Sequence, residues 1–166
     1  MFNLQTYTVI HVLIGLIGIA TGSMVAAALL ESKRLTRPTR VFLSTTALTS
    51  ITGFGFPFEH LLPSHIVGLL SLAVLAVAAY ARYGRGLAGA WRWIYVVTAM
   101  IALYFNAFVL VIQTFQKVPV LKRLAPTQTE LPFAAVQLTV LAAFVIFTAT
   151  AALKFHPERN RPTASV

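Results

Sequence analysis

The stretch YTVIHVLIGLIGIATGSMVAAALLESKRLTRPTR, residues 7–40, decides the fold. Residues 7–30 contain no Asp, Glu, Lys or Arg. At 1.5 Å per residue they form a helix of about 36 Å, long enough to cross a hydrocarbon core of about 30 Å. Four basic residues follow within the next ten positions. Because short basic loops stay cytoplasmic, this order predicts a membrane helix whose N-terminus lies outside.

The same alternation of apolar and basic segments continues along the chain and predicts five membrane helices. The spans cover about 7–30, 40–58, 65–83, 91–116 and 132–154. Ten of the 13 Lys and Arg residues then lie on the cytoplasmic side: Lys33, Arg34, Arg37, Arg40, Arg82, Arg85, Arg92, Lys154, Arg159 and Arg161. The outer side receives Lys117, Lys122 and Arg123. The prediction is an all-α integral membrane bundle, one domain over 1–156, with a cytoplasmic C-terminus and a disordered tail over 157–166.

Composition excludes several classes of protein. The chain is 58% hydrophobic and only 10% charged, with a mean hydropathy of +0.80, which a water-soluble domain does not show. Its net charge of +9 is spread over short loops and a tail, so the pattern indicates topology beside anionic lipid and no nucleic-acid partner. Without cysteine, the chain forms no disulfide, iron–sulfur cluster or thiolate metal site.

Small residues in the first span indicate a helix-packing face. His11, Gly15, Gly18 and Gly22 follow one another at spacings of 4, 3 and 4, which places them on one side of a helix. Glycine lets helix backbones approach closely in membranes, so this face packs in the bundle or in a dimer, and His11 points inward. Gly68 and His65 give the third span a weaker version of the same face.

Polar residues of the predicted outer half form a candidate ligand site. Asn106 and Gln113 are seven residues apart on the fourth span, and Glu130 and Gln137 are seven apart at the start of the fifth. Together with His11 they predict an outward-opening polar cavity, closed below by an apolar plug, because polar groups at membrane depth need a partner or a ligand.

Histidines and glutamates on the outer side also form a candidate metal site, made of His11, Glu59, His60 and His65. Neutral imidazole with carboxylate suits zinc, copper, iron or nickel better than magnesium or calcium. No compact ligand motif such as H-x-x-x-H or H-E-x-x-H accompanies them. An inward pair of His11 and His65 leaves haem as an alternative cofactor.

Two blocks carry a resemblance to known proteins. FGFPFEHLLPSHIVG (54–68) and FNAFVLVIQTFQKVPVLKRLAPTQTE (105–130) are similar to segments of an uncharacterised family of small polytopic bacterial inner-membrane proteins. The resemblance covers about a quarter of the chain. It implies the bacterial inner membrane and no assigned activity.

Three functions follow as hypotheses. The first is a protein that binds, or helps to transport, a small molecule or metal ion through the outer polar residues. The second is a non-catalytic subunit or assembly partner of a larger membrane complex, or a homo-oligomer, and the glycine face of the first span favours it. The third is a haem- or quinone-linked redox protein that uses the outer histidines. The sequence favours a protein that is not an enzyme.

Overall fold

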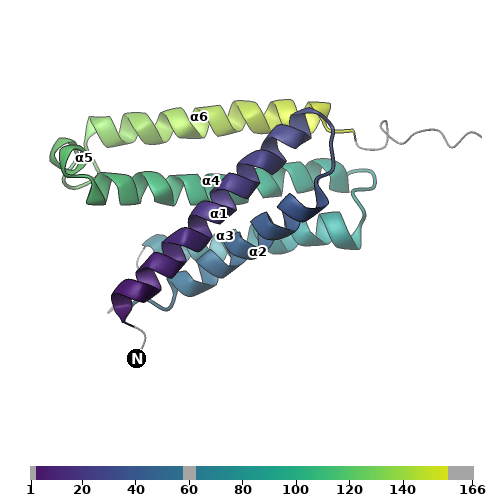
Figure 1. Ribbon diagram of the computed structural model, residues 1–166. Coiled ribbons are helices and arrows are strands. Elements are labelled where there is room, and N and C mark those ends of the chain that lie inside the picture. Colours follow the sequence, from purple (N-terminus) through teal and green to yellow (C-terminus); the bar gives the residue numbers. More distant parts are fainter. Residues whose placement is uncertain (1–2, 58–62, 157–166) are drawn as a thin grey trace, which may run out of the picture.

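A computed structural model describes residues 3–57 and 63–156, and every regular element in these two ranges is helical. Figure 1 shows the arrangement. The helices are α1 (Leu4–Leu30), α2 (Thr36–Gly53), α3 (Pro63–Ala79), η1 (Tyr80–Gly84), α4 (Trp91–Lys117), α5 (Pro119–Leu124) and α6 (Leu131–Lys154). The all-helical fold is therefore confirmed, while glutamate 59, histidine 60 and the tail over 157–166 lie outside the described residues.

Local chemistry explains most helix boundaries. The Asn3 side chain caps α1 by accepting a hydrogen bond from the backbone N–H of Gln5 at 3.3 Å. α4 ends at Lys117 because Val118 is extended, the conformation favoured for a residue that precedes proline. α2 begins at 36 and ends at Gly53, whereas the sequence predicts a span over about 40–58; two glycines and a proline within 53–57 stop it early.

Four helical segments are long and apolar enough to cross a membrane. They are Leu4–Leu30, His65–Gly84, Trp91–Lys117 and Leu131–Lys154. α2 is not among them, because its first turns carry Arg37 and Arg40 and its remainder is rich in threonine. The chain is thus a multi-pass membrane protein with four candidate spans, one fewer than the sequence predicts.

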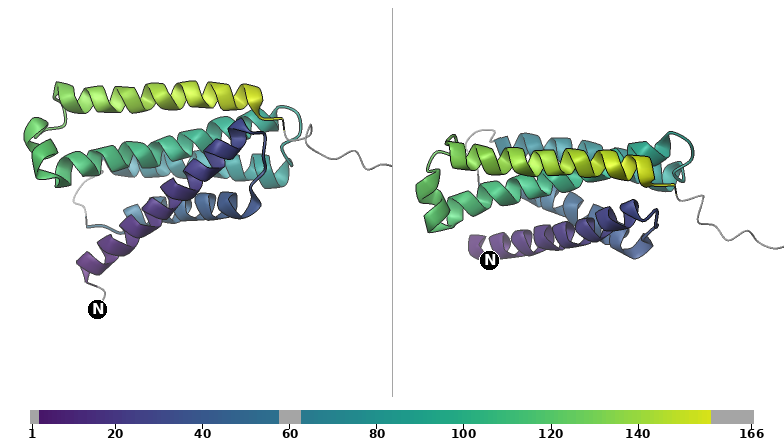
Figure 2. Two further views of the ribbon diagram at one scale, coloured as in Figure 1. Left: turned by 45° about the horizontal axis from the view of Figure 1, so that its top comes forward. Right: turned by 90° about the horizontal axis from the view of Figure 1, so that it is seen from above.

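The helices divide into a parallel group and one that crosses it. α6 runs beside α4, and α3 packs against both α2 and α4 (Figure 1). α1 packs mainly on α2 and crosses the bundle at an angle, so its N-terminal end diverges from α6 (Figure 2). The short α5 turns the chain between α4 and α6.

The apolar core lies in the half of the bundle that contains the basic loops. Its largest fully buried side chains include Tyr95, Phe42, Phe155 and Leu29. In α1 all six buried residues fall between Gly18 and Leu29, while large apolar side chains of the first turns are exposed. We call this the basic half, and the opposite half, which contains the N-terminus of α1 and α5, the outer half.

Cross-segment hydrogen bonds join the basic loops at one end. Three guanidinium groups donate to backbone carbonyls of other segments: Arg34 to Gly86 at 2.8 Å, Arg82 to Leu35 at 3.0 Å and Arg92 to Phe155 at 2.6 Å. The Ser32 hydroxyl adds a bond to the carbonyl of Lys154 at 2.6 Å. These bonds supply side-chain donors to carbonyls at helix ends and in the loops between helices.

Candidate functional site

A polar and aromatic cluster joins α1 to the C-terminal end of α2 in the outer half. His11 Nδ1 lies 2.8 Å from the hydroxyl of Thr52, and the Tyr7 hydroxyl donates to the backbone carbonyl of the same threonine at 2.6 Å. The Phe56 ring meets both side chains edge-on, with centroid distances of 5.1 Å to His11 and 5.0 Å to Tyr7. The cluster holds the half-buried imidazole in one orientation.

The hydrogen bonds of Thr52 relate the tautomer of His11 to the end of α2. A threonine hydroxyl has one proton, and the Thr52 oxygen lies 2.7 Å from the carbonyl of Leu48 in its own helix as well as 2.8 Å from His11 Nδ1. With the hydroxyl proton on the Leu48 carbonyl, the Thr52 oxygen accepts from His11, and Nδ1 carries the imidazole proton. Nε2 is left with a lone pair, and no hydrogen bond among the described residues engages it. This is the form in which histidine accepts a proton or binds a metal ion.

His65 approaches the same turn of α2 from the opposite side. It lies in the first turn of α3, is 5% exposed, and stacks on Phe54 at 5.3 Å between centroids with an interplanar angle of 26°. Gly68 lies one turn further on and also contacts the Phe54 ring. The segment 54–56 therefore separates His65 from His11, and each imidazole packs against a different phenylalanine.

Asn106 forms a second polar contact at a different depth. Its amide Nδ2 donates to the hydroxyl of Thr46 at 3.0 Å and lies beside Gly18 of α1. Gly18 is seven residues beyond His11, which corresponds to about 10 Å along the axis of α1. Asn106 of α4 thus meets α1 and α2 about 10 Å along the axis of α1 from His11.

The remaining predicted ligand residues do not join them. Gln113 is exposed on α4. Gln137 lies between α6 and α4, where its Nε2 donates to the carbonyl of Phe108 at 3.3 Å; its Oε1 is buried without a partner among the described residues. Positions 106 and 108 face different sides of a helix, so the structure separates Gln137 from Asn106.

Glu130 orders the loop that precedes α6. Its carboxylate accepts hydrogen bonds from the backbone N–H and the hydroxyl of Thr127, at 3.0 and 2.8 Å, and from the backbone N–H of Thr129 at 3.1 Å. Desolvation by itself would raise the pKa of this carboxyl. The hydrogen bonds favour the ionised form more strongly, and the pKa is held below its usual value. Glu130 therefore shapes the loop before α6 and lies away from His11.

No group of three or more histidine, aspartate or glutamate side chains that could hold a metal ion occurs within 3–57 and 63–156. Two of the four residues predicted as metal ligands, at positions 59 and 60, lie outside these ranges. Of the other two, His11 bonds to Thr52 and His65 stacks on Phe54.

The glycines singled out in the sequence lie at close helix contacts. A Cβ atom at Gly22 would stand 2.6 Å from Leu103 and 2.8 Å from the Phe42 ring, and one at Gly18 would stand 3.1 Å from the hydroxyls of Thr45 and Thr46. At Gly15 the nearest atom, in Thr49, would be 3.5 Å away, which is ordinary contact. α1 therefore approaches its neighbours most closely at Gly22.

Sequence reasoning missed the aromatic part of the outer cluster. Tyr7 precedes His11 by four residues and so shares its helix face, a spacing that could have indicated it. Phe54 and Phe56 carry no comparable signal, because their contacts depend on how the chain turns after α2.

No protein-family model, curated protein or solved structure matches this chain.

Proposed function

We propose that this chain is a membrane-embedded binding protein that crosses the bilayer five times and takes a small molecule or metal ion at His11, on the side opposite its basic end. The observation that carries the binding proposal is the hydrogen bond between His11 Nδ1 and Thr52, which leaves Nε2 as an acceptor. A bonded partner of this kind fixes the ring orientation of an imidazole that binds a ligand.

The connectivity supports the fifth crossing. α1 ends among the basic loops, since Ser32 and Arg34 bond to residues at the ends of α6 and η1. α3 begins in the outer half, where His65 contacts the C-terminal turn of α2. A chain that leaves one end and restarts at the other must traverse the bundle, and α2 is the helix between them. Its 18 residues span about 27 Å, close to the thickness of the hydrocarbon core.

The distribution of charge supports the orientation. The basic half contains eight of the eleven described Lys and Arg residues, which by the rule for short loops places it in the cytoplasm. The absence of cysteine permits a direct test. In intact cells a membrane-impermeant maleimide should label K122C and should label K33C only after the membrane is opened. The reverse pattern would overturn the orientation, and labelling of both in intact cells would overturn the five-crossing path.

The binding proposal is tested on protein labelled with ¹⁵N in its four histidines. We expect His11 to show a protonated Nδ1 and an unprotonated Nε2 at neutral pH. Titration with Zn²⁺, or with ammonium as a hydrogen-bond donor that coordinates nothing, should shift the Nε2 resonance to a saturating value, and sodium chloride should not. An Nε2–H tautomer, or saturation by neither probe, would overturn the proposal.

Two matched variants separate this site from general packing. Thr52→Val removes the partner of His11 and should weaken Zn²⁺ binding about tenfold, as loss of an outer-shell partner typically does. Thr49→Val makes the same chemical change one turn away and should leave binding unchanged, because the hydroxyl there bonds to the carbonyl of Thr45 and to no other atom of the described residues. Equal losses in the two variants would contradict the role assigned to Thr52.

A further inference from the structure

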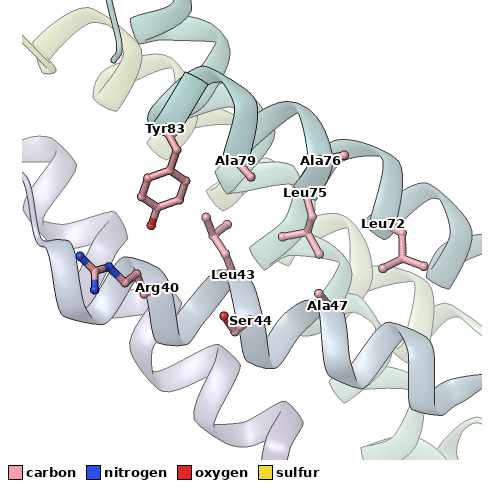
Figure 3. Close-up of a pocket in the computed structure, with 9 residues that line it drawn as sticks. All are labelled: Arg40, Leu43, Ser44, Ala47, Leu72, Leu75, Ala76, Ala79 and Tyr83. Atoms are coloured by element: carbon pink, nitrogen blue, oxygen red, sulfur yellow. The ribbon is translucent and has the colours of Figure 1, made fainter. Parts of the chain in front are cut away.

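A groove of about 570 Å³ runs between α2 and the helix formed by α3 and η1 (Figure 3). Small side chains make the room, among them Ala47, Ala76 and Ala79, and leucines form much of the wall. Its full lining is Arg40, Leu43, Ser44, Ala47, Leu72, Leu75, Ala76, Ala79 and Tyr83. None of the residues placed in the outer cluster takes part.

The length of the groove matches one leaflet of a bilayer. From Leu72 to Tyr83 the chain advances eleven residues, which is about 16 Å at 1.5 Å per residue. Half of a hydrocarbon core of about 30 Å is about 15 Å. Because Tyr83 and Arg40 belong to the basic end, the groove extends from that membrane surface to about mid-membrane.

The polar groups of the groove gather at its basic end. Figure 3 shows the side chains of Arg40 and Tyr83 at one end of the groove and Leu72 and Ala47 toward the other. No hydrogen bond or ion pair engages the Arg40 guanidinium among the described residues. This sets it apart from Arg82 and Arg92, whose guanidinium groups donate to backbone carbonyls.

We propose that this groove holds one phospholipid with an anionic headgroup, taken from the leaflet at the basic end. An acyl chain lies along the alanines and leucines, and the phosphate lies at Arg40, whose planar guanidinium donates two parallel hydrogen bonds to phosphate oxygens. The Tyr83 hydroxyl is a second donor at the same end. Basic pockets between membrane helices on the cytoplasmic side recognise anionic headgroups in this way. The proposal does not depend on ligand binding at His11.

The test is lipid binding to delipidated, detergent-purified protein, measured by native mass spectrometry. Phosphatidylglycerol should bind about fivefold more tightly than phosphatidylcholine with the same acyl chains, the ratio expected for one basic group near a membrane surface. Arg40→Gln should abolish this preference. Arg37→Gln removes the same charge one turn earlier on α2, outside the groove, and should retain the preference.

A second variant tests the acyl chain. Ala76→Leu fills the groove without a change of charge and should weaken both lipids, whereas glycerol 3-phosphate at millimolar concentration should displace neither. Equal affinity of the wild type for the two lipids, equal losses in the two arginine variants, unchanged binding to Ala76→Leu, or displacement by glycerol 3-phosphate would each overturn the proposal. A wild-type dimer that Ala76→Leu dissociates would also overturn it, because a second copy would then occupy the groove.

Discussion

The two halves of the bundle are held together by different means. In the basic half, buried apolar side chains form a continuous core and three arginines reach backbone carbonyls of other segments. In the outer half, the first turns of α1 expose large apolar residues, and the contacts to α2 are made by hydroxyl, imidazole and aromatic groups. α1 belongs to both halves and is close-packed only in one of them.

The hydrogen bonds of the two halves also differ in strength. Charged donors at helix ends can satisfy carbonyls with strong hydrogen bonds and still reach water at the membrane surface, so they hold the basic half without a large desolvation cost. Neutral groups at membrane depth form weaker bonds, about 0.6 kcal/mol on average in measured cases. The outer half is therefore the part that the weaker contacts hold together.

The largest expected effect comes from the point where α1 crosses its neighbours. Gly22→Ala places a methyl group against the fully buried Phe42 ring and Leu103, and we expect it to reduce the free energy of unfolding by about 2 to 3 kcal/mol. The measurement is reversible unfolding of the purified protein in mixed micelles.

Gly15→Ala is the matched control in the outer half. Its methyl group would meet Thr49 at ordinary contact distance, so the better helix propensity of alanine should leave stability unchanged or raised by about 0.5 kcal/mol. If both substitutions destabilise equally, the two halves of α1 are packed alike and the comparison fails.

A smaller effect is expected from the arginine contacts of the basic half. Arg82→Gln removes the bond to the carbonyl of Leu35 and the position of the guanidinium 5.4 Å above the Tyr95 ring, and should cost about 1.5 to 2 kcal/mol in the same unfolding measurement. Arg37→Gln changes an exposed arginine without a described partner and should stay within about 0.5 kcal/mol. Similar losses would show that net charge, and not the specific contact, stabilises this half.

The smallest effect concerns the hydrogen bonds of Glu130 in the loop before α6. Because hydrogen bonds hold the pKa of Glu130 below the usual 4.5, its ionised form stabilises the loop above that pH, and the contribution is lost as the pH falls through the lower folded-state pKa. The carboxyl ¹³C resonance should titrate with a midpoint below 4.5. The Thr127 and Thr129 amide resonances should move with it and become insensitive to pH in Glu130→Gln. A midpoint at or above 4.5 would contradict the role of these hydrogen bonds in ordering the loop.

The sequence predicted the helices well because hydropathy and basic loops report directly on the membrane. It also identified the glycine face, since a spacing of three and four residues is a property of one helix. The candidate site was only partly predictable. The seven-residue spacings and the common depth group Asn106, Gln113 and Gln137, but which side of α4 faces α1 or α6 depends on packing between helices, and the structure separates Gln137 from Asn106. The end of α2 at Gly53 moved the aromatic residues into a turn, which no periodicity indicates.

The π-turn η1 in the basic half affects how the chain tolerates the loss of a residue. η1 is a π-turn, in which the N–H of Arg85 bonds to the carbonyl of Tyr80 at 2.9 Å, five residues back. Such a turn accommodates one residue more than an α-helical turn, and it directs Arg82 toward the core while Tyr83 lines the groove. Loss of a single codon within 80–84 would let the turn become α-helical while the side chains beyond it keep their orientation relative to α3, because the π-turn holds one extra residue. The orientation of the later segments is thus less sensitive to the loss of a residue here than in an α-helical turn.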